Sequence, residues 1–305
     1  MTPFQRYLAE EIAIDHADGL IERREALRRL ALLGLGVPAA TALLAACGAG
    51  DDTGGDAAAA GPSADRPGTP ATAPAGPSPL PTEAITFAGP EGTTLQAAWA
   101  PAENPRGAVL VIHENRGLTD HIRSVAGRLA ASGFSALAID LLSREGGTAA
   151  VGDEAQVIAT LGGIPQERFV ADMRAALDEL ERRASGSKLG MTGFCFGGGM
   201  TWLLLASGEP RLAAAVPFYG PLPDDADFSG SRAAVLGVYA EQDARVNATR
   251  EAARAALERA GLKHEIVTFP GVDHAFFNDT GQRYDAGAAA QAYQRLIDWF
   301  GENLA

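Results

Sequence analysis

The sequence predicts one α/β domain over residues 83–305, built on a mostly parallel central sheet that is flanked by helices. Two observations indicate this class. Short apolar runs of strand length alternate with helical stretches, which is typical of a sheet covered on both faces. The region also has roughly 220 residues, a length that suits a single domain. The expected strands lie at residues 108–113, 134–140, 188–193, 212–219, 233–239 and 264–269.

Two further runs precede these strands and predict an N-terminal antiparallel hairpin at one edge of the sheet. They lie at residues 85–87 and 94–99, and a turn rich in glycine separates them. A connection as short as this favours antiparallel pairing, because parallel strands need a longer crossover.

The segment 193–198, with the sequence GFCFGG, has the form of a nucleophile elbow, G-x-S-x-G, with Cys195 in the place of the serine. A strand is expected just before it and a helix just after it. That order places the turn residue at the top of the sheet of an α/β-hydrolase. The start of the helix favours a thiolate and offers N–H groups to an anion. The alternative is that Cys195 is an inert, buried thiol.

A nucleophile elbow requires an acid and then a histidine later in the chain. Asp243 follows the expected strand at 233–239, and His274 lies in the loop after the last strand. Both therefore lie where the strands end, at the edge where sheets of this class bind ligands. Three alternatives stay open: Glu241 or Asp273 as the acid, and His113 as the base.

These residue types favour acyl transfer. A cysteine is nucleophilic as the thiolate, and a histidine can take its proton and later return it to a leaving alkoxide. An aspartate holds the imidazole in the correct tautomer and stabilises its cation. We therefore expect a Cys195–His274–Asp243 triad that forms an acyl-enzyme from a small ester or lactone.

From about residue 83 to the C-terminus the chain resembles the dienelactone hydrolase family. The resemblance rests on the cysteine elbow, on Asp243 and His274 in that order, and on the segments HENRG at 113–117 and DLLSR at 140–144. It implies roles for four further residues. Glu114 would contact the nucleophile and govern its protonation, the backbone N–H groups of Asn115 and Phe196 would form the oxyanion hole, and Arg144 would bind a substrate carboxylate.

Structural roles remain as alternatives for two of these residues. Glu114 could instead form an ion pair with Arg116 or Arg144, and Arg144 could be a solvated surface residue. The sequence also departs from the family at one position. Members that cleave dienelactone have a second arginine four residues beyond the histidine, where this chain has Asn278. One carboxylate clamp is therefore missing from the expected site.

Residues 1–47 have the features of an export signal. Arg23 and Arg24 form a twin-arginine pair, and an uncharged apolar run follows at residues 30–46. The run ends in LAAC, which resembles a bacterial lipobox whose cysteine, here Cys47, becomes lipidated. We expect an exported protein, held at a membrane of the cell envelope by this lipid. The alternative is that the run stays uncleaved, either as a membrane anchor or as a buried hydrophobic helix.

Residues 48–82 are expected to be a disordered tether. They are rich in Gly, Ala, Pro, Ser, Thr and Asp and contain one large apolar residue, Leu80. Such a segment cannot bury enough apolar surface to fold. A catalytically silent surface lipoprotein that uses the domain as a binding module is the alternative to an enzyme.

The charge of the chain argues against a nucleic-acid partner. It has 25 basic and 38 acidic residues, a net charge of −13, and the domain contains no basic cluster. No His/Cys cluster has the spacing of a zinc site, and no phosphate-binding loop occurs. The sequence therefore predicts neither a metal nor a cofactor.

Overall fold

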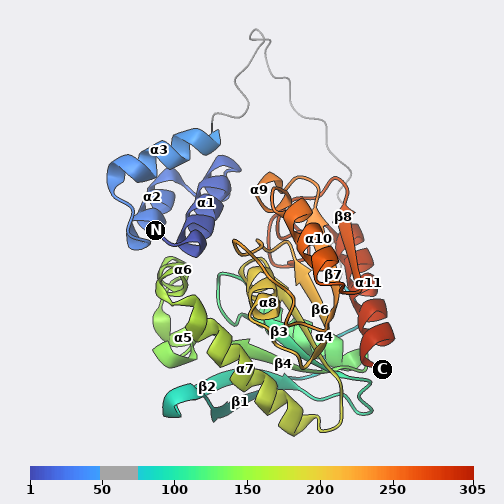
Figure 1. Cartoon of the computed structure of the whole chain (residues 1–305). Helices are drawn as coiled ribbons and strands as arrows, with labels where there is room; N and C mark the ends of the chain where they lie inside the picture. Colours follow the sequence, from blue (N-terminus) through green and yellow to red (C-terminus); the bar gives the residue numbers. More distant parts are fainter. Residues whose placement is uncertain (49–74) are drawn as a thin grey trace.

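A computed structural model describes residues 1–48 and 75–305, and its centre is one eight-stranded sheet (Figure 1). The strand order is β1-β2-β4-β3-β5-β6-β7-β8. β2 pairs antiparallel with β1 and β4, and every other neighbouring pair is parallel. The predicted parallel sheet and edge hairpin are thereby confirmed. The strands are β1 (Glu83–Ala88), β2 (Thr94–Ala100), β3 (Ala108–Ile112), β4 (Ser135–Asp140), β5 (Leu189–Phe194), β6 (Leu212–Phe218), β7 (Ala234–Ala240) and β8 (His264–Phe269).

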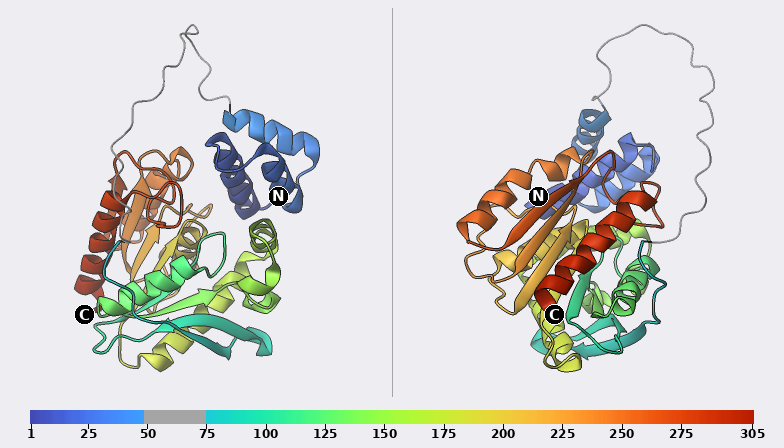
Figure 2. Two further views of the ribbon diagram at one scale, coloured as in Figure 1. Left: turned by 180° about the vertical axis from the view of Figure 1, so that it is seen from behind. Right: turned by 90° about the vertical axis from the view of Figure 1, so that its right-hand side faces the viewer.

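The central strands are buried on both faces, which explains why they read as continuous apolar runs. Every residue of β3, β4, β5 and β7 is buried. α7 and α8 pack on one face of the sheet, and α4 and α11 pack on the other (Figure 2). The helices of the domain are α4 (Asp120–Ala131), α5 (Thr148–Val151), α6 (Glu154–Gly163), α7 (Gln166–Arg183), α8 (Phe196–Ala206), α9 (Ala244–Asn247), α10 (Arg250–Arg259) and α11 (Ala286–Leu304), with short 3₁₀ turns η2 (Pro90–Gly92) and η3 (Ser143–Glu145).

The packed part of the domain begins before residue 83, which corrects the predicted start. Residues 75–82, expected as the end of the tether, lie against α4. The buried Arg128 donates from Nη1 to the carbonyl of Ala75 at 2.8 Å, and the N–H of Leu80 bonds to the carbonyl of Gly127 at 3.1 Å. A buried guanidinium needs such acceptors, which holds this stretch in place. The rest of the predicted tether, residues 49–74, lies outside the described residues.

Three helices precede the domain and pack on one another (Figure 1). They are α1 (Pro3–Ala17), α2 (Arg23–Leu32) and α3 (Val37–Gly48). Two of them, α1 and α2, also pack on α6. Thr2 and Gln5 form a capping box that starts α1. The packing against α6 is close, since a Cβ at Gly162 would lie 2.7 Å from the side chain of Leu33. None of the helices in residues 1–48 and 75–305 combines the length and apolar character needed to cross a membrane.

Candidate active site

Cys195 lies at a sharp turn between β5 and α8, as the elbow motif predicts. Its backbone has φ 56° and ψ −116°, a strained conformation for a residue with a side chain. The neighbouring glycines are required by close contacts. A Cβ at Gly193 would lie 2.1 Å from the carbonyl oxygen of Gly197, and one at Gly197 would lie 2.4 Å from that of Ile112. The elbow therefore brings the thiol to the edge of the sheet where the parallel strands end.

Asp243 and His274 meet Cys195 at that edge. Asp243 follows β7 and caps α9, and His274 lies in the loop after β8. The Nδ1 atom of His274 is 2.5 Å from Oδ2 of Asp243. A ring nitrogen of His274 and the Sγ atom of Cys195 lie within 4.8 Å of each other, and the nitrogen that is not bonded to Asp243 is Nε2. All three side chains are buried.

The alternative acids and base are engaged elsewhere. Glu241 accepts a hydrogen bond from the N–H of Gly271, and Asp273 accepts one from the backbone N–H of His274. His113 bonds through Nδ1 to the carbonyl of Glu114 and through Nε2 to the N–H of Leu141. The arrangement of side chains thus favours Asp243 and His274 over the three alternatives.

The charges of this cluster depend on one another. Burial alone would raise the pKa of Asp243, but the charge and hydrogen bond of His274 lower it. Burial opposes protonation of His274, yet the carboxylates of Glu11 and Asp243 raise its pKa well above the usual range. Burial, and then the charge of Glu11, raise the pKa of the Cys195 thiol. These shifts favour a protonated imidazole and a neutral thiol.

Glu114 lies in the loop after β3, and no arginine of residues 1–48 or 75–305 pairs with it. Its Oε2 atom accepts a 2.5 Å hydrogen bond from Nδ2 of Asn278, whereas its buried Oε1 atom is without a hydrogen-bond partner. Arg116 pairs instead with Glu154 at 3.3 Å. Asn278, identified from the sequence only as a missing arginine, therefore holds Glu114 in place. The oxygen of the Asn278 amide accepts bonds from Thr280, which orients its NH₂ group toward the carboxylate.

The two predicted oxyanion-hole residues lie beside the thiol. Asn115 lines the same small cavity as Cys195 and Glu114. Phe196 is the first residue of α8, so its N–H has no partner within that helix and is available to an anion.

Arg144 lies in a different environment from the one expected. It pairs with the buried Asp172 at 2.5 Å and with Glu91 at 3.2 Å. The residues that line the cavity beside Cys195 do not include it. Asp172 is almost fully buried on α7, and an uncompensated carboxylate there would be costly. These contacts fit a structural role for Arg144 better than the binding of a substrate carboxylate. The alternative expected from the sequence is a solvated surface arginine, whereas this side chain is largely buried.

Sequence reasoning missed the contribution of α1 to the site. The hydroxyl of Tyr7 is 3.4 Å from Sγ of Cys195. The Oε1 atom of Glu11 is 3.3 Å from Nε2 of His274 and 3.9 Å from the Cys195 sulfur. The signal in the sequence is the set of acidic residues Glu11, Asp15 and Asp18, whose spacing places them on one side of a helix.

The ligand atoms of Glu11, Cys195 and His274 lie within 4.8 Å of one another. Within the described residues they are the one group close enough to coordinate a metal ion. Thiolate, imidazole and carboxylate are all zinc ligands. The positions of two of the three are explained without a metal. His274 is held by its hydrogen bond to Asp243, and Cys195 is held by the elbow.

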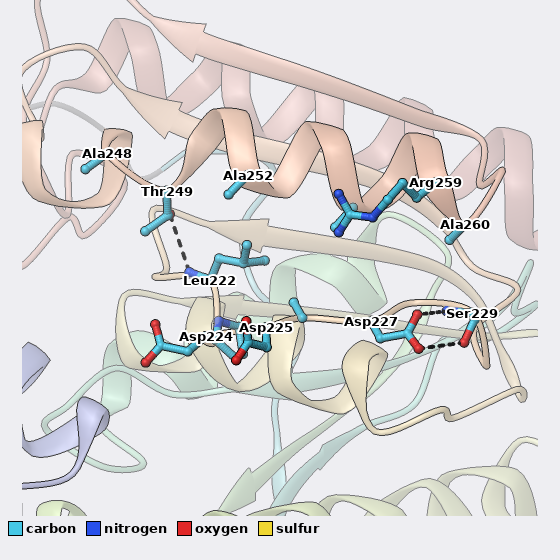
Figure 3. Close-up of a pocket in the computed structure, with 13 residues that line it drawn as sticks. Leu222, Asp224, Asp225, Asp227, Ser229, Ala248, Thr249, Ala252, Arg259 and Ala260 are labelled. Carbon is cyan, nitrogen blue, oxygen red and sulfur yellow. Dashed lines mark hydrogen bonds between the residues drawn. The ribbon is translucent and has the colours of Figure 1, made fainter.

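The cavities around the thiol are small. The one beside Cys195 measures about 60 Å³. A second, of about 240 Å³, lies on the other side of Glu11 and is lined by His274 and by Cys47 of α3. A larger hollow, of about 580 Å³, lies between residues 222–229 and α10 (Figure 3). It is acidic on one side, and its described lining contains neither cysteine nor histidine.

Comparison with known proteins places this site in a family. The model of the dienelactone hydrolase family matches residues 95–304. A Salmonella typhi protein named "Putative carboxymethylenebutenolidase" is 33% identical over 237 residues, which cover 72% of this chain and 86% of that protein. The crystal structure of a "Putative Dienelactone Hydrolase" from Klebsiella pneumoniae is 31% identical with a TM-score of 0.63, covering 73% of this chain and 100% of that one.

A second solved structure, a dienelactone hydrolase-like promiscuous phosphotriesterase from metagenomic libraries, is 27% identical with a TM-score of 0.65. The match covers 74% of this chain and 100% of the other. These matches agree with the cysteine elbow, the parallel sheet and the buried His274–Asp243 pair. The chain therefore belongs to the dienelactone hydrolase family of the α/β-hydrolase superfamily, and it is a hydrolase of the carboxylic ester or lactone class.

Proposed function

We propose that this protein is an exported hydrolase of small esters or lactones that acts through Cys195, His274 and Asp243. The observation that carries the proposal is the position of Cys195 at a strained elbow, close to an imidazole that a buried carboxylate holds through Nδ1. Such a cluster supplies a nucleophile, a base and an orienting acid.

The reaction would proceed through an acyl-enzyme. In the reactive state the thiol proton moves to Nε2 of His274, and Sγ attacks the carbonyl carbon of the substrate. The carbonyl oxygen becomes an oxyanion, which the N–H groups of Asn115 and Phe196 stabilise. Each such donor contributes about 3–4 kcal/mol to transition-state stabilisation.

The intermediate then breaks its C–O bond, and the alkoxide leaves with the proton from His274. The thioester on Cys195 is next attacked by water, whose proton passes to the same imidazole. The breakdown of this second intermediate releases the carboxylic acid and restores the thiol. Glu114, buried beside the sulfur and held by Asn278, would govern the protonation of Cys195 during the cycle.

The nucleophile can be tested directly. Cys195→Ala should abolish hydrolysis of aryl acetates and small lactones while the protein remains folded. Intact mass spectrometry of the exported, processed form after mixing with a slow ester should detect one acyl group on that form and none on its Cys195→Ala variant. Hydrolysis that persists in Cys195→Ala would refute the mechanism. Absence of both acylation and turnover in the exported form across a panel of esters and lactones would favour the silent binding module.

Export and lipid attachment are part of the proposal. Arg23 and Arg24 begin α2 and are exposed, so a receptor could reach them. Cys47 lies at the end of α3 and is half-buried. Replacing both arginines by lysine should leave the protein inside the cell, and Cys47→Ala should release it from the membrane fraction. If Cys47→Ala stays with the membrane, the apolar run is an anchor instead.

A further inference from the structure

One face of α1 lies in the catalytic cleft. Phe4, Tyr7 and Glu11 are spaced three and four residues apart, so they project from the same side of the helix, and all three are buried. The ring of Phe4 lies 5.0 Å from that of Phe196 and 6.1 Å from that of Phe169. The helix thus packs directly on the residue that follows the nucleophile.

The next two positions on this face contact the reacting atoms. The hydroxyl of Tyr7 and the Oε1 atom of Glu11 approach the Cys195 sulfur at 3.4 and 3.9 Å. The same oxygen lies 3.3 Å from Nε2 of His274, the nitrogen that has to accept the thiol proton. Glu11 thereby stabilises the imidazolium and keeps the imidazole from acting as a base.

Two arginines of the catalytic domain hold α1 in this position. Arg245, which follows Asp243 closely in sequence, pairs with Glu11 and donates to the carbonyl of Tyr7 at 3.3 Å. Its guanidinium also lies 4.1 Å from the centre of the Tyr7 ring, a cation–π contact. Arg283, in the region after His274, pairs with two further carboxylates of this segment, those of Asp15 at 2.9 Å and Asp18.

Little space is left for a substrate. The cavity beside Cys195 measures about 60 Å³ and is bounded by Glu11 and Asp15. Pockets that bind small molecules usually measure about 300–1,000 Å³. A water molecule or two fits the remaining space, but the acyl and alcohol parts of an ester do not.

We infer that α1 is an intramolecular inhibitor, which has to leave the cleft before a substrate can reach Cys195. The inference rests on the proposed roles of Cys195 and His274. Cleavage before Cys47, the processing that accompanies the proposed lipid attachment, would also remove α1 and so open the active site. The precursor would then be silent and the exported form active.

The test uses the full chain with substitutions on α1 alone, which leave the catalytic domain unchanged. Two substitutions should weaken the docking of α1. Phe4→Asp places a charge in the aromatic contact with Phe196, and Asp15→Arg replaces the ion pair with Arg283 by repulsion between two positive charges. Arg6→Ala, on the exposed side of the same helix, is the matched control. The readouts are the rate of Cys195 alkylation by iodoacetamide, mapped by peptide mass to separate it from Cys47, and the rate of aryl acetate hydrolysis.

Both docking variants should be alkylated about tenfold faster or more than the unmodified chain, because the rate follows the population of the undocked state. Hydrolysis should rise in parallel, and Arg6→Ala should change neither rate. Faster alkylation without any hydrolysis would support the covered cleft and contradict the proposed hydrolase activity. Unchanged alkylation in both variants would overturn the inference. Faster alkylation with hydrolysis falling below that of the unmodified chain would mean that α1 takes part in catalysis.

A peptide added in trans separates inhibition from misfolding. A synthetic peptide of residues 2–18 should inhibit Phe4→Asp in competition with the ester. The same peptide with Glu11→Gln and Tyr7→Phe should inhibit about tenfold less, since it loses the contacts with Arg245 and Cys195. Equal inhibition by the two peptides, or none by either, would contradict the assignment of this face of α1 to the cleft.

Discussion

The hydrogen bond between Asn278 and Glu114 can be tested with Asn278→Leu, a substitution of similar volume. A hydrogen bond to a charged group contributes about 1.5–3 kcal/mol, and the variant removes one such bond to a buried carboxylate. It also removes the two bonds that Asn278 accepts from Thr280, each contributing about 1 kcal/mol. The adjacent cavity can admit water, which would compensate in part.

We therefore expect Asn278→Leu to lower the free energy of unfolding by about 2–4 kcal/mol. For a domain of this size, each kcal/mol shifts the melting temperature by about 2–4 °C. Thermal unfolding followed by circular dichroism should then show a loss of roughly 5–15 °C. Thr280→Val is the matched control, because it removes only a hydroxyl donor to the same amide and should cost about 1 kcal/mol.

Hydrolysis should also fall in Asn278→Leu, since Glu114 would no longer be held beside the sulfur. The comparison with Thr280→Val decides the outcome. If both variants melt at the same temperature, the bond from Asn278 to Glu114 contributes nothing measurable, and the argument that Asn278 holds Glu114 in place is wrong.

Three further predictions follow from the site. Because the pKa of His274 is raised on folding, its contribution to stability is present below its unfolded pKa of about 6.5 and is lost as pH rises toward the folded value. Urea unfolding should thus show stability falling above pH 6.5, with a shallower fall in Glu11→Gln. Arg144→Met should destabilise the protein by about 3 kcal/mol, because the buried Asp172 would keep only the longer 3.9 Å ion pair with Arg168. The variant should hydrolyse acidic and neutral esters more slowly by the same factor. A loss of rate for acidic esters alone would support the sequence-based prediction that Arg144 binds a substrate carboxylate. Cys195→Ser should lose most activity in a steady-state ester assay, because the hydroxyl is far less acidic than the thiol, and near-normal turnover would count against thiolate chemistry.

The sheet and the elbow could be predicted because their signals are local. Buried parallel strands are continuous apolar runs, and the elbow needs Gly193 and Gly197 at fixed positions around Cys195. Asp243 and His274 could be placed because the order of the triad follows the order of the strands. In each case the relevant residues are close in sequence or lie at the ends of recognisable strands.

The partners of polar side chains could not be predicted in the same way. Arg144 at the end of a strand can face a substrate or a helix, and the choice depends on Asp172, whose position on α7 is not visible from the motif. Glu11 and His274 are far apart in the chain, and no periodic pattern links them. From the sequence, position 278 could be identified only as lacking the second arginine of the family. The hydrogen bond that Asn278 donates to Glu114 is visible only in the structure.

Arg245 pairs with Glu11, and Arg283 pairs with Asp15. Substitutions on α1 and substitutions in the catalytic cleft are therefore expected to depend on each other during evolution. In the proposed export signal, charge and hydrophobicity would be the features that an export receptor recognises. In this chain, replacement of Arg245 or Arg283 by an acidic residue would require a basic residue at the paired position on α1. Related sequences that carry the same N-terminal extension should therefore vary at 11 and 245, and at 15 and 283, in concert. Sequences without the extension should be free of that constraint.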